Sequence, residues 1–201
     1  MDKINVYDFD NTLYDGESTL DFYLFCVKKH PRLCRFIFIV VFTLVKYKLC
    51  LVSEEKLMSL CEKYVMDFLR DCPDANELVE LFWQKNSKKL RRFYGEVKKD
   101  DDAVVSASFG FLLRPVIEQM GINNLLCSEV DLTSGKILRL CFRKNKEKLF
   151  REFFADKTID DFYTDSMNDL PLMKLAKGSV YLVKGEKVNL YKLHPERREN
   201  Q

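Results

Sequence analysis

The spacing of apolar residues changes twice along the chain, and these changes predict its organisation. Short apolar runs typical of buried strands occur at residues 3–9 and 103–105. From about residue 100 onward such runs alternate with segments of helical spacing, and further strands are expected at 125–130, 159–164 and 179–183. Strands and helices in alternation predict an α/β fold with a Rossmann-like parallel sheet.

The stretch between the first two predicted strands follows a helical pattern throughout. Its apolar residues recur at the spacing of a helix face, with interruptions at Pro31 and Pro73. Because this block interrupts the alternation of strands and helices, we expect an inserted, all-helical cap at residues 17–99. Residues 1–16 and 100–201 would then form the core.

The most apolar stretch of the chain lies inside this predicted cap, from Phe36 to Val45. Ten residues are too few to span a bilayer, which takes about 20. The pattern favours a helix buried within the cap. The alternative is a helix that lies on a membrane surface, with basic residues at its rim: Lys28, Lys29, Arg32, Arg35, Lys46 and Lys48.

Composition excludes several classes of function. The net charge of the 201 residues is +2, so the protein has no overall field that would favour nucleic acid. Seven cysteines without a CxxC pair predict reduced thiols in the cytoplasm, and the N-terminal residues lack the layout of a signal peptide. Neither His30 nor His194 has sequence neighbours that would complete a catalytic triad or a zinc site.

Acidic residues gather where predicted strands end. Asp8 and Asp10 are two residues apart, so a strand would direct both side chains to the same side, where a cation or a shared proton must separate them. Further reactive groups lie near other strand ends or open a helix: Ser106, Lys146, Asp165 and Asp169. Such a set suits Mg²⁺ and phosphoryl transfer through an aspartyl-phosphate.

Four motifs occur in the order and approximate spacing of a known family. They are DFDNTL, VVSAS, a lysine before a helix, and YTDSMNDLPLM. The chain resembles the haloacid dehalogenase-like (HAD) phosphohydrolases, in particular the phosphoserine-phosphatase-like branch, whose helical cap follows the first motif. The resemblance covers essentially the whole chain, although the cap matches loosely.

The resemblance implies a role for each matching residue. Asp8 would be the nucleophile that attacks phosphorus, and Asp10 would protonate the leaving oxygen and then deprotonate water. Ser106 would hydrogen-bond a phosphoryl oxygen. Asn11 departs from the family, in which Gly, Ser or a similar residue follows the second aspartate.

The resemblance also implies a magnesium site. Asp165 would bind the metal through its side chain, Asp169 would support it directly or through water, and Asn168 would help to fix the loop. The backbone carbonyl of Asp10 would complete the implied metal residues, which are Asp8, Asp10, Asp165 and Asp169.

The basic residue of the family lies in a CxGxxK-like context. This aligns Cys141 with the first position and Lys146 with the last, and it places Arg143 where relatives have glycine. Lys144 and Lys148 are neighbouring candidates for the same contact with phosphate.

Together these features predict a Mg²⁺-dependent phosphomonoester hydrolase that acts through Asp8 in the cytoplasm. Its substrate would be either a small phosphorylated metabolite or a lipid phosphate. The apolar cap segment resembles that of phosphatidylglycerophosphatases of this branch, which would bring the enzyme to the inner face of the membrane. The other alternative is a non-catalytic binding module, against which the complete acid set argues.

Overall fold

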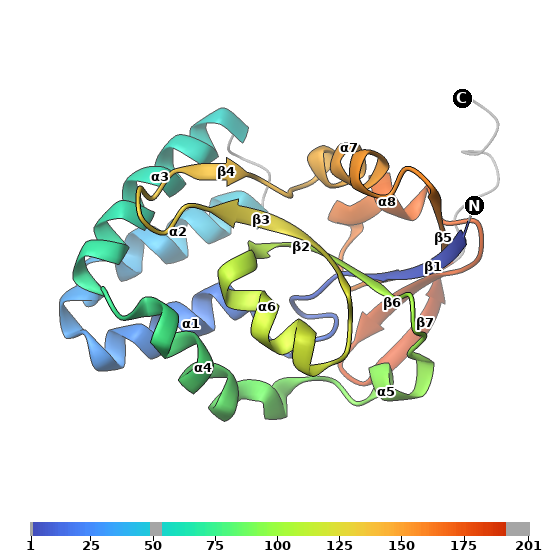
Figure 1. Cartoon of the computed structure of the whole chain (residues 1–201), viewed down its shortest axis with the longest axis horizontal. Helices are drawn as coiled ribbons and strands as arrows, with labels where there is room; N and C mark the ends of the chain where they lie inside the picture. The colour runs from blue at the N-terminus through green and yellow to red at the C-terminus, as the bar shows by residue number, and fades with distance from the viewer. Residues whose placement is uncertain (1, 49–53, 192–201) are drawn as a thin grey trace.

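A computed structural model describes residues 2–48 and 54–191. Its seven-stranded sheet has the order β4-β3-β2-β1-β5-β6-β7, and all neighbouring strands are parallel except the two edge pairs (Figure 1). The predicted α/β fold is therefore confirmed. The strands are β1 (Asp2–Tyr7), β2 (Ala103–Phe109), β3 (Asn124–Val130), β4 (Ile137–Arg139), β5 (Lys157–Thr164), β6 (Val180–Lys184) and β7 (Lys187–Tyr191). The edge strand β7 was not predicted.

Helices cover both faces of the sheet. Five helices lie between β1 and β2 in the sequence: α1 (Ser18–Lys29), α2 (Ile37–Lys48), α3 (Glu54–Asp71), α4 (Ala75–Asn86) and α5 (Phe93–Val97). After β2 come α6 (Gly110–Gln119), α7 (Lys144–Phe153) and α8 (Leu170–Met173), and short 3₁₀ segments occur at Pro31–Phe36, Ser87–Lys89 and Met167–Asp169. The division into core and cap stays a prediction.

The alternating side chains of the central strands build two hydrophobic cores, one on each face. Val6 and Val105 pack with α7 and α8 on one face, whereas Tyr7 and Val104 pack with α4 and α6 on the other. Trp83 of α4 donates a hydrogen bond from Nε1 to the backbone carbonyl of Leu112, at 2.6 Å. Part of the helical insertion is thus built into the layer that covers the sheet.

Helix α2 contradicts the expectation of a buried apolar helix. Phe38, Phe42 and Val45 are 84%, 59% and 47% exposed, and their spacing puts them on one face of the helix. We call this set the apolar face of α2. Residues 49–53, which follow α2 in the sequence, lie outside the described residues. Among the described helices, none is both long and apolar enough to cross a membrane.

Candidate active site

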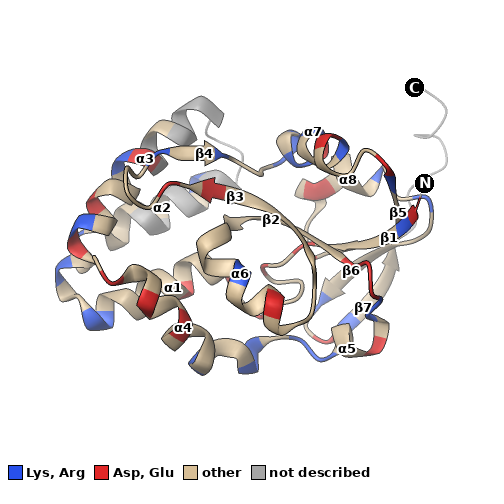
Figure 2. Cartoon of the chain, in the orientation of Figure 1, with Lys and Arg blue, Asp and Glu red and all other residues tan. Residues whose placement is uncertain are grey.

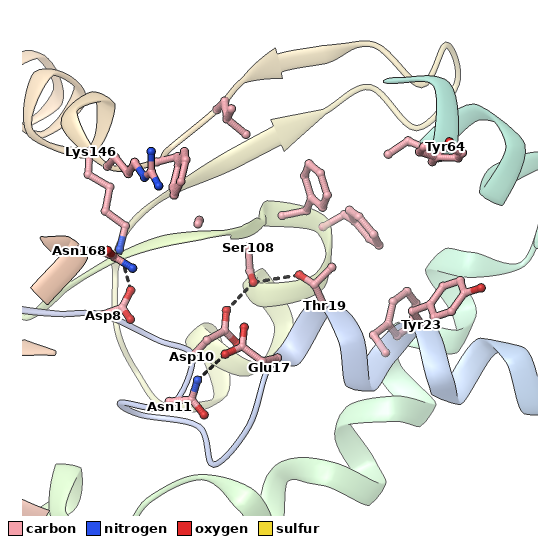
Figure 3. A pocket seen from close by; sticks show the side chains of 18 of the residues that line it. Asp8, Asp10, Asn11, Glu17, Thr19, Tyr23, Tyr64, Ser108, Lys146 and Asn168 are labelled. Carbon is pink, nitrogen blue, oxygen red and sulfur yellow. Dashed lines mark hydrogen bonds and ion pairs between the residues drawn. The ribbon is translucent and has the colours of Figure 1, made fainter. Parts of the chain in front are cut away.

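A buried lysine joins two carboxylates at the carboxyl edge of the sheet. Asp8 directly follows β1, and its backbone N–H donates to Tyr163 in β5 at 2.9 Å, which aligns the ends of the two strands. Lys146 enters from the first turn of α7, and its Nζ lies 2.8 Å from Oδ1 of both Asp8 and Asp169. Figure 3 shows its side chain reaching Asp8. All three residues are buried, and none is more than 8% exposed.

This geometry distinguishes Lys146 from its neighbours. Lys144 and Lys148 are exposed on α7, whereas Lys146 is 4% exposed and bonded to both acids. Burial alone would lower the pKa of Lys146, but the carboxylates of Asp169 and Asp8 outweigh it and hold that pKa well above its usual value. The ammonium is therefore a permanent positive charge in the site.

Several acidic residues surround the buried contact between Lys146 and Asp8. Burial raises the pKa of Asp8 well above its usual value, and the neighbouring Asp169 and Asp165 raise it further, against the opposing effect of Lys146. Asp165 lies half-buried in the wall of the same cavity. This set of carboxylate oxygens suits a hard divalent cation such as Mg²⁺.

Thr164 is a site residue that the sequence analysis did not single out. Its hydroxyl donates to Oδ2 of Asp169 at 2.8 Å and accepts the backbone N–H of Ser166 at 3.1 Å. This side chain therefore makes two hydrogen bonds within the loop. The loop that carries Asp165 and Asp169 is thereby fixed to the end of β5.

Asp10 lies between the start of α1 and the end of β2. Its Oδ1 accepts the backbone N–H of Ser18 at 2.7 Å, and its Oδ2 accepts the hydroxyl of Ser108 at 2.6 Å (Figure 3). Burial raises the pKa of Asp10 despite these hydrogen bonds. A carboxyl group with a raised pKa is suited to donate a proton to a leaving group and to recover one from water.

Two serines end β2, and they occupy different positions. Ser106 is 1% exposed, and its hydroxyl accepts the backbone N–H of Ser108 at 3.1 Å. Ser108 lines the cavity together with Ala107, and its hydroxyl also lies 3.0 Å from that of Thr19. Ser106 is not among the lining residues, so the structure brings Ser108, rather than Ser106, to the cavity wall. In the sequence, the S-x-S pattern formed by Ser106 and Ser108 could have indicated this second hydroxyl.

Asn11 and Arg143 have positive φ angles, which glycine adopts more readily than other residues. Asn11 has φ 59°, and its side chain is hydrogen-bonded to Glu17. Arg143 has φ 49° and ψ −123°, a conformation that glycine adopts far more readily. This explains physically why relatives have glycine there, because the bend turns the chain into α7 and presents Lys146 to the site.

A cavity of about 350 Å³ extends from these polar groups toward the helical insertion. Its floor contains Asp8, Asp10 and Lys146, and its outer walls are aromatic and aliphatic side chains from α1, α3 and the β3–β4 region. Figure 3 shows Tyr23 and Tyr64 on the side away from Lys146. The site thus combines a charged floor with an apolar approach.

Comparison with known proteins gives a family match. The sequence profile of haloacid dehalogenase-like hydrolases matches residues 6–174, which include every residue of the site described above. No curated protein sequence matches the chain.

Solved structures with the same fold have low sequence identity to this chain. A protein of unknown function from Bordetella pertussis Tohama I has a TM-score of 0.68 at 18% identity, over 87% of this chain and 86% of that one. A phosphoserine phosphohydrolase-like protein from Francisella tularensis subsp. tularensis SCHU S4 has a TM-score of 0.60 at 15% identity, over 90% and 86%. A phosphoserine phosphatase solved as a phospho-aspartyl intermediate analogue has 0.54 at 14%, over 94% and 95%.

Proposed function

The chain belongs to the haloacid dehalogenase-like hydrolase family, and on this basis we propose that it is a Mg²⁺-dependent phosphomonoester hydrolase. The observation that carries the proposal is the buried contact of Lys146 with Asp8 and Asp169, beside Asp10. A structure named as a phospho-aspartyl intermediate analogue has the same fold, which supports an aspartate as the group that is phosphorylated.

In the proposed reaction, a carboxylate oxygen of Asp8 attacks phosphorus while the bond from phosphorus to the ester oxygen breaks. Asp10 donates its proton to the departing oxygen, and its raised pKa keeps that proton available. Water then attacks phosphorus, Asp10 takes the water's proton, and Asp8 and inorganic phosphate are released. Lys146 and the hydroxyl of Ser108 on the cavity wall would stabilise the phosphoryl oxygens.

The metal fits the same set of residues. We assign Mg²⁺ to the carboxylates of Asp8 and Asp165 and to the backbone carbonyl of Asp10, with Asp169 as support. Bound there, the ion would neutralise charge on the transferring phosphoryl group. Lys146 contacts Oδ1 of Asp8 and Oδ1 of Asp169 and so holds both side chains in place. Because Oδ2 of Asp169 already accepts the hydroxyl of Thr164, Oδ2 of Asp8 would be the oxygen that faces the metal.

For the substrate, we infer a phosphoester with an apolar group, as in a lipid phosphate, rather than a small polar metabolite. Phe22, Phe68 and Phe111 are among the apolar side chains that line the cavity, and a polar metabolite would leave them uncovered. Phe36 also lines the cavity and directly precedes α2, so the wall of the cavity and the apolar face of α2 are neighbours in the sequence.

The apolar face of α2 favours contact with the surface of an anionic membrane. Two exposed phenylalanines on one side of a helix can enter the headgroup region. Lys28, Lys29 and Arg32 are exposed nearby in the sequence, whereas positive and negative residues are mixed over the rest of the molecule (Figure 2). Membrane contact at the inner face of the membrane would bring a lipid phosphate to the cavity.

The test of the function is phosphate release with and without Mg²⁺, for the wild type and for Asp8→Asn. Asp156→Asn is the matched control, because Asp156 is an exposed aspartate away from the site. Phosphatidylglycerophosphate in detergent, phosphoserine, sugar phosphates and an aryl phosphate form the panel. We expect release that requires Mg²⁺, disappears in Asp8→Asn and persists in Asp156→Asn.

Each other result has a definite meaning. Release that survives in Asp8→Asn would refute the nucleophile assignment, and no release from any ester would favour a non-catalytic binding module. Preference for phosphoserine would refute the lipid assignment.

For the membrane contact, Phe38→Ser/Phe42→Ser should lower co-sedimentation with anionic liposomes and leave hydrolysis of the aryl phosphate unchanged. Equal co-sedimentation of this variant and the wild type would count against the membrane contact.

A further inference from the structure

Three side chains with metal-binding atoms meet at a corner of the helical insertion, away from the proposed catalytic aspartates. The ligand atoms of His30, Cys72 and Asp74 all lie within 4.8 Å of one another. Cys26 precedes His30 by one helical turn, and the nearby thiol of Cys72, together with burial, raises the pKa of Cys26. The sequence analysis expected no zinc site at His30, because Cys72 and Asp74 lie distant from it in the sequence.

The backbone fixes all four residues before any ligand is considered. Cys26 and His30 lie four residues apart at the end of α1, where the N–H of His30 donates to the carbonyl of Cys26 at 2.7 Å. Cys72 directly follows α3, and its N–H donates to the carbonyl of Phe68 at 2.8 Å. Asp74 directly precedes α4. The cluster therefore joins the ends of three helices.

Asp74 does not perform the usual task of an aspartate at its position. It is the N-cap residue of α4, yet its side chain makes no capping hydrogen bond. Its Oδ1 instead lies 2.6 Å from Nε2 of His30 and 3.7 Å from the sulfur of Cys72. The carboxylate is thus turned away from its own helix and toward the thiols and the imidazole.

The contact between His30 and Asp74 is close but poorly directed. Nε2 of His30 is buried and makes no hydrogen bond of acceptable geometry, although the carboxylate oxygen is only 2.6 Å away. A metal ion bound by both atoms would give each of them a partner. A buried imidazole nitrogen with no satisfactory bond needs such a partner.

We propose that Cys26, His30, Cys72 and Asp74 bind a Zn²⁺ ion that clamps the helical insertion. Two thiolates, an imidazole and a carboxylate give the four ligands of a tetrahedral structural zinc site, and the soft sulfur ligands disfavour Mg²⁺. Both cysteines are fully buried, whereas the side chains of His30 and Asp74 are 29% and 36% exposed, so the ion can enter from their side. The proposal does not depend on the proposed catalytic function.

The experiment is a titration of the metal-stripped, reduced full-length protein with Co²⁺. Thiolate ligands give Co²⁺ an intense charge-transfer absorption that an oxygen-only magnesium site does not produce. We expect this absorption to saturate at a single equivalent and to disappear when Zn²⁺ is added. It should persist in Asp8→Asn, which alters the catalytic site alone, and in Cys34→Ser, which removes an exposed thiol outside the cluster.

Variants of the cluster decide the assignment. The double variant Cys26→Ser/Cys72→Ser should lose the charge-transfer absorption, and Cys72→Ser alone should weaken it. His30→Gln and Asp74→Asn, at partly exposed positions, should bind Co²⁺ at least about tenfold more weakly while circular dichroism shows an unchanged fold. Absence of the absorption in the wild type would overturn the proposal, as would its full retention in Cys26→Ser/Cys72→Ser. A Cys26–Cys72 disulfide in protein purified without reductant, combined with no Co²⁺ binding after reduction, would assign the pair to redox chemistry instead.

Discussion

Replacing Lys146 by methionine should destabilise the fold strongly, and by an amount that depends on pH. The substitution keeps the aliphatic stem but removes the ammonium, which makes 2.8 Å contacts with both Asp8 and Asp169. Removing one partner of a buried ion pair typically costs about 3–5 kcal/mol, because the remaining charge stays buried. Lys148→Met, two residues further along α7 and exposed, should change stability by less than about 0.5 kcal/mol.

The pH dependence follows from Asp8. Its pKa is already raised by burial and rises further when Lys146 is removed. The folded variant then holds a proton that the unfolded chain releases above about pH 4, so its stability falls as pH increases from there toward the raised pKa. The loss relative to wild type should therefore be smaller at pH 5 than at pH 7.5.

Urea denaturation in buffer without divalent cations measures this loss. The fluorescence of Trp83 reports unfolding, because it is the only tryptophan and is buried against α6. Equal stability of Lys146→Met and Lys148→Met would refute the account of a buried charge network. A large loss that is the same at both pH values would show that packing, and not the unpaired carboxylates, is responsible.

Three further predictions concern single residues. Arg143→Gly should raise stability by about 0.5–1 kcal/mol in urea denaturation, because glycine adopts the left-handed backbone at this position without strain; a loss of stability would contradict this reasoning. Ser108→Ala removes a hydrogen bond to Asp10 and should lower kcat/KM about ten- to a hundredfold, whereas an unchanged value would exclude this hydroxyl from the reaction. Cys34 is exposed, whereas burial raises the pKa of Cys141 to about 12, so peptide mapping should find Cys34 alkylated first at mildly alkaline pH; the reverse order would be inconsistent with this burial pattern.

Local patterns were sufficient to predict the fold class and the elements that carry the site. The run ending in Asp8 and the strand before Asp165 were recognisable because buried parallel strands are short, apolar and followed by polar turns. The strands expected after residue 100 correspond to β2, β3, β5 and β6, although β2 continues to Phe109. Strand β7 was missed because it has little burial to impose an apolar pattern.

Features that depend on contacts between distant segments could not be predicted in the same way. Hydrophobicity predicted a helix near Phe38 but contained no information on whether another element covers it. Likewise, His30 has no metal-binding sequence motif, and only the packing of α1 against the α3–α4 turn brings Cys72 and Asp74 to it. The hydroxyl of Thr164 acquires its role because Asp169 folds back over it.

The bond between Asp10 and the first N–H of α1 links proton transfer to the anchoring of a helix. Ser18 donates this N–H to the carboxylate proposed to exchange the proton during turnover. An ionised carboxylate at a helix N-terminus is typically worth about 0.3–1 kcal/mol more than a neutral one. In the proposed reaction, the hydrogen bond that anchors α1 would therefore weaken while Asp10 holds its proton and strengthen between the departure of the leaving group and the attack of water.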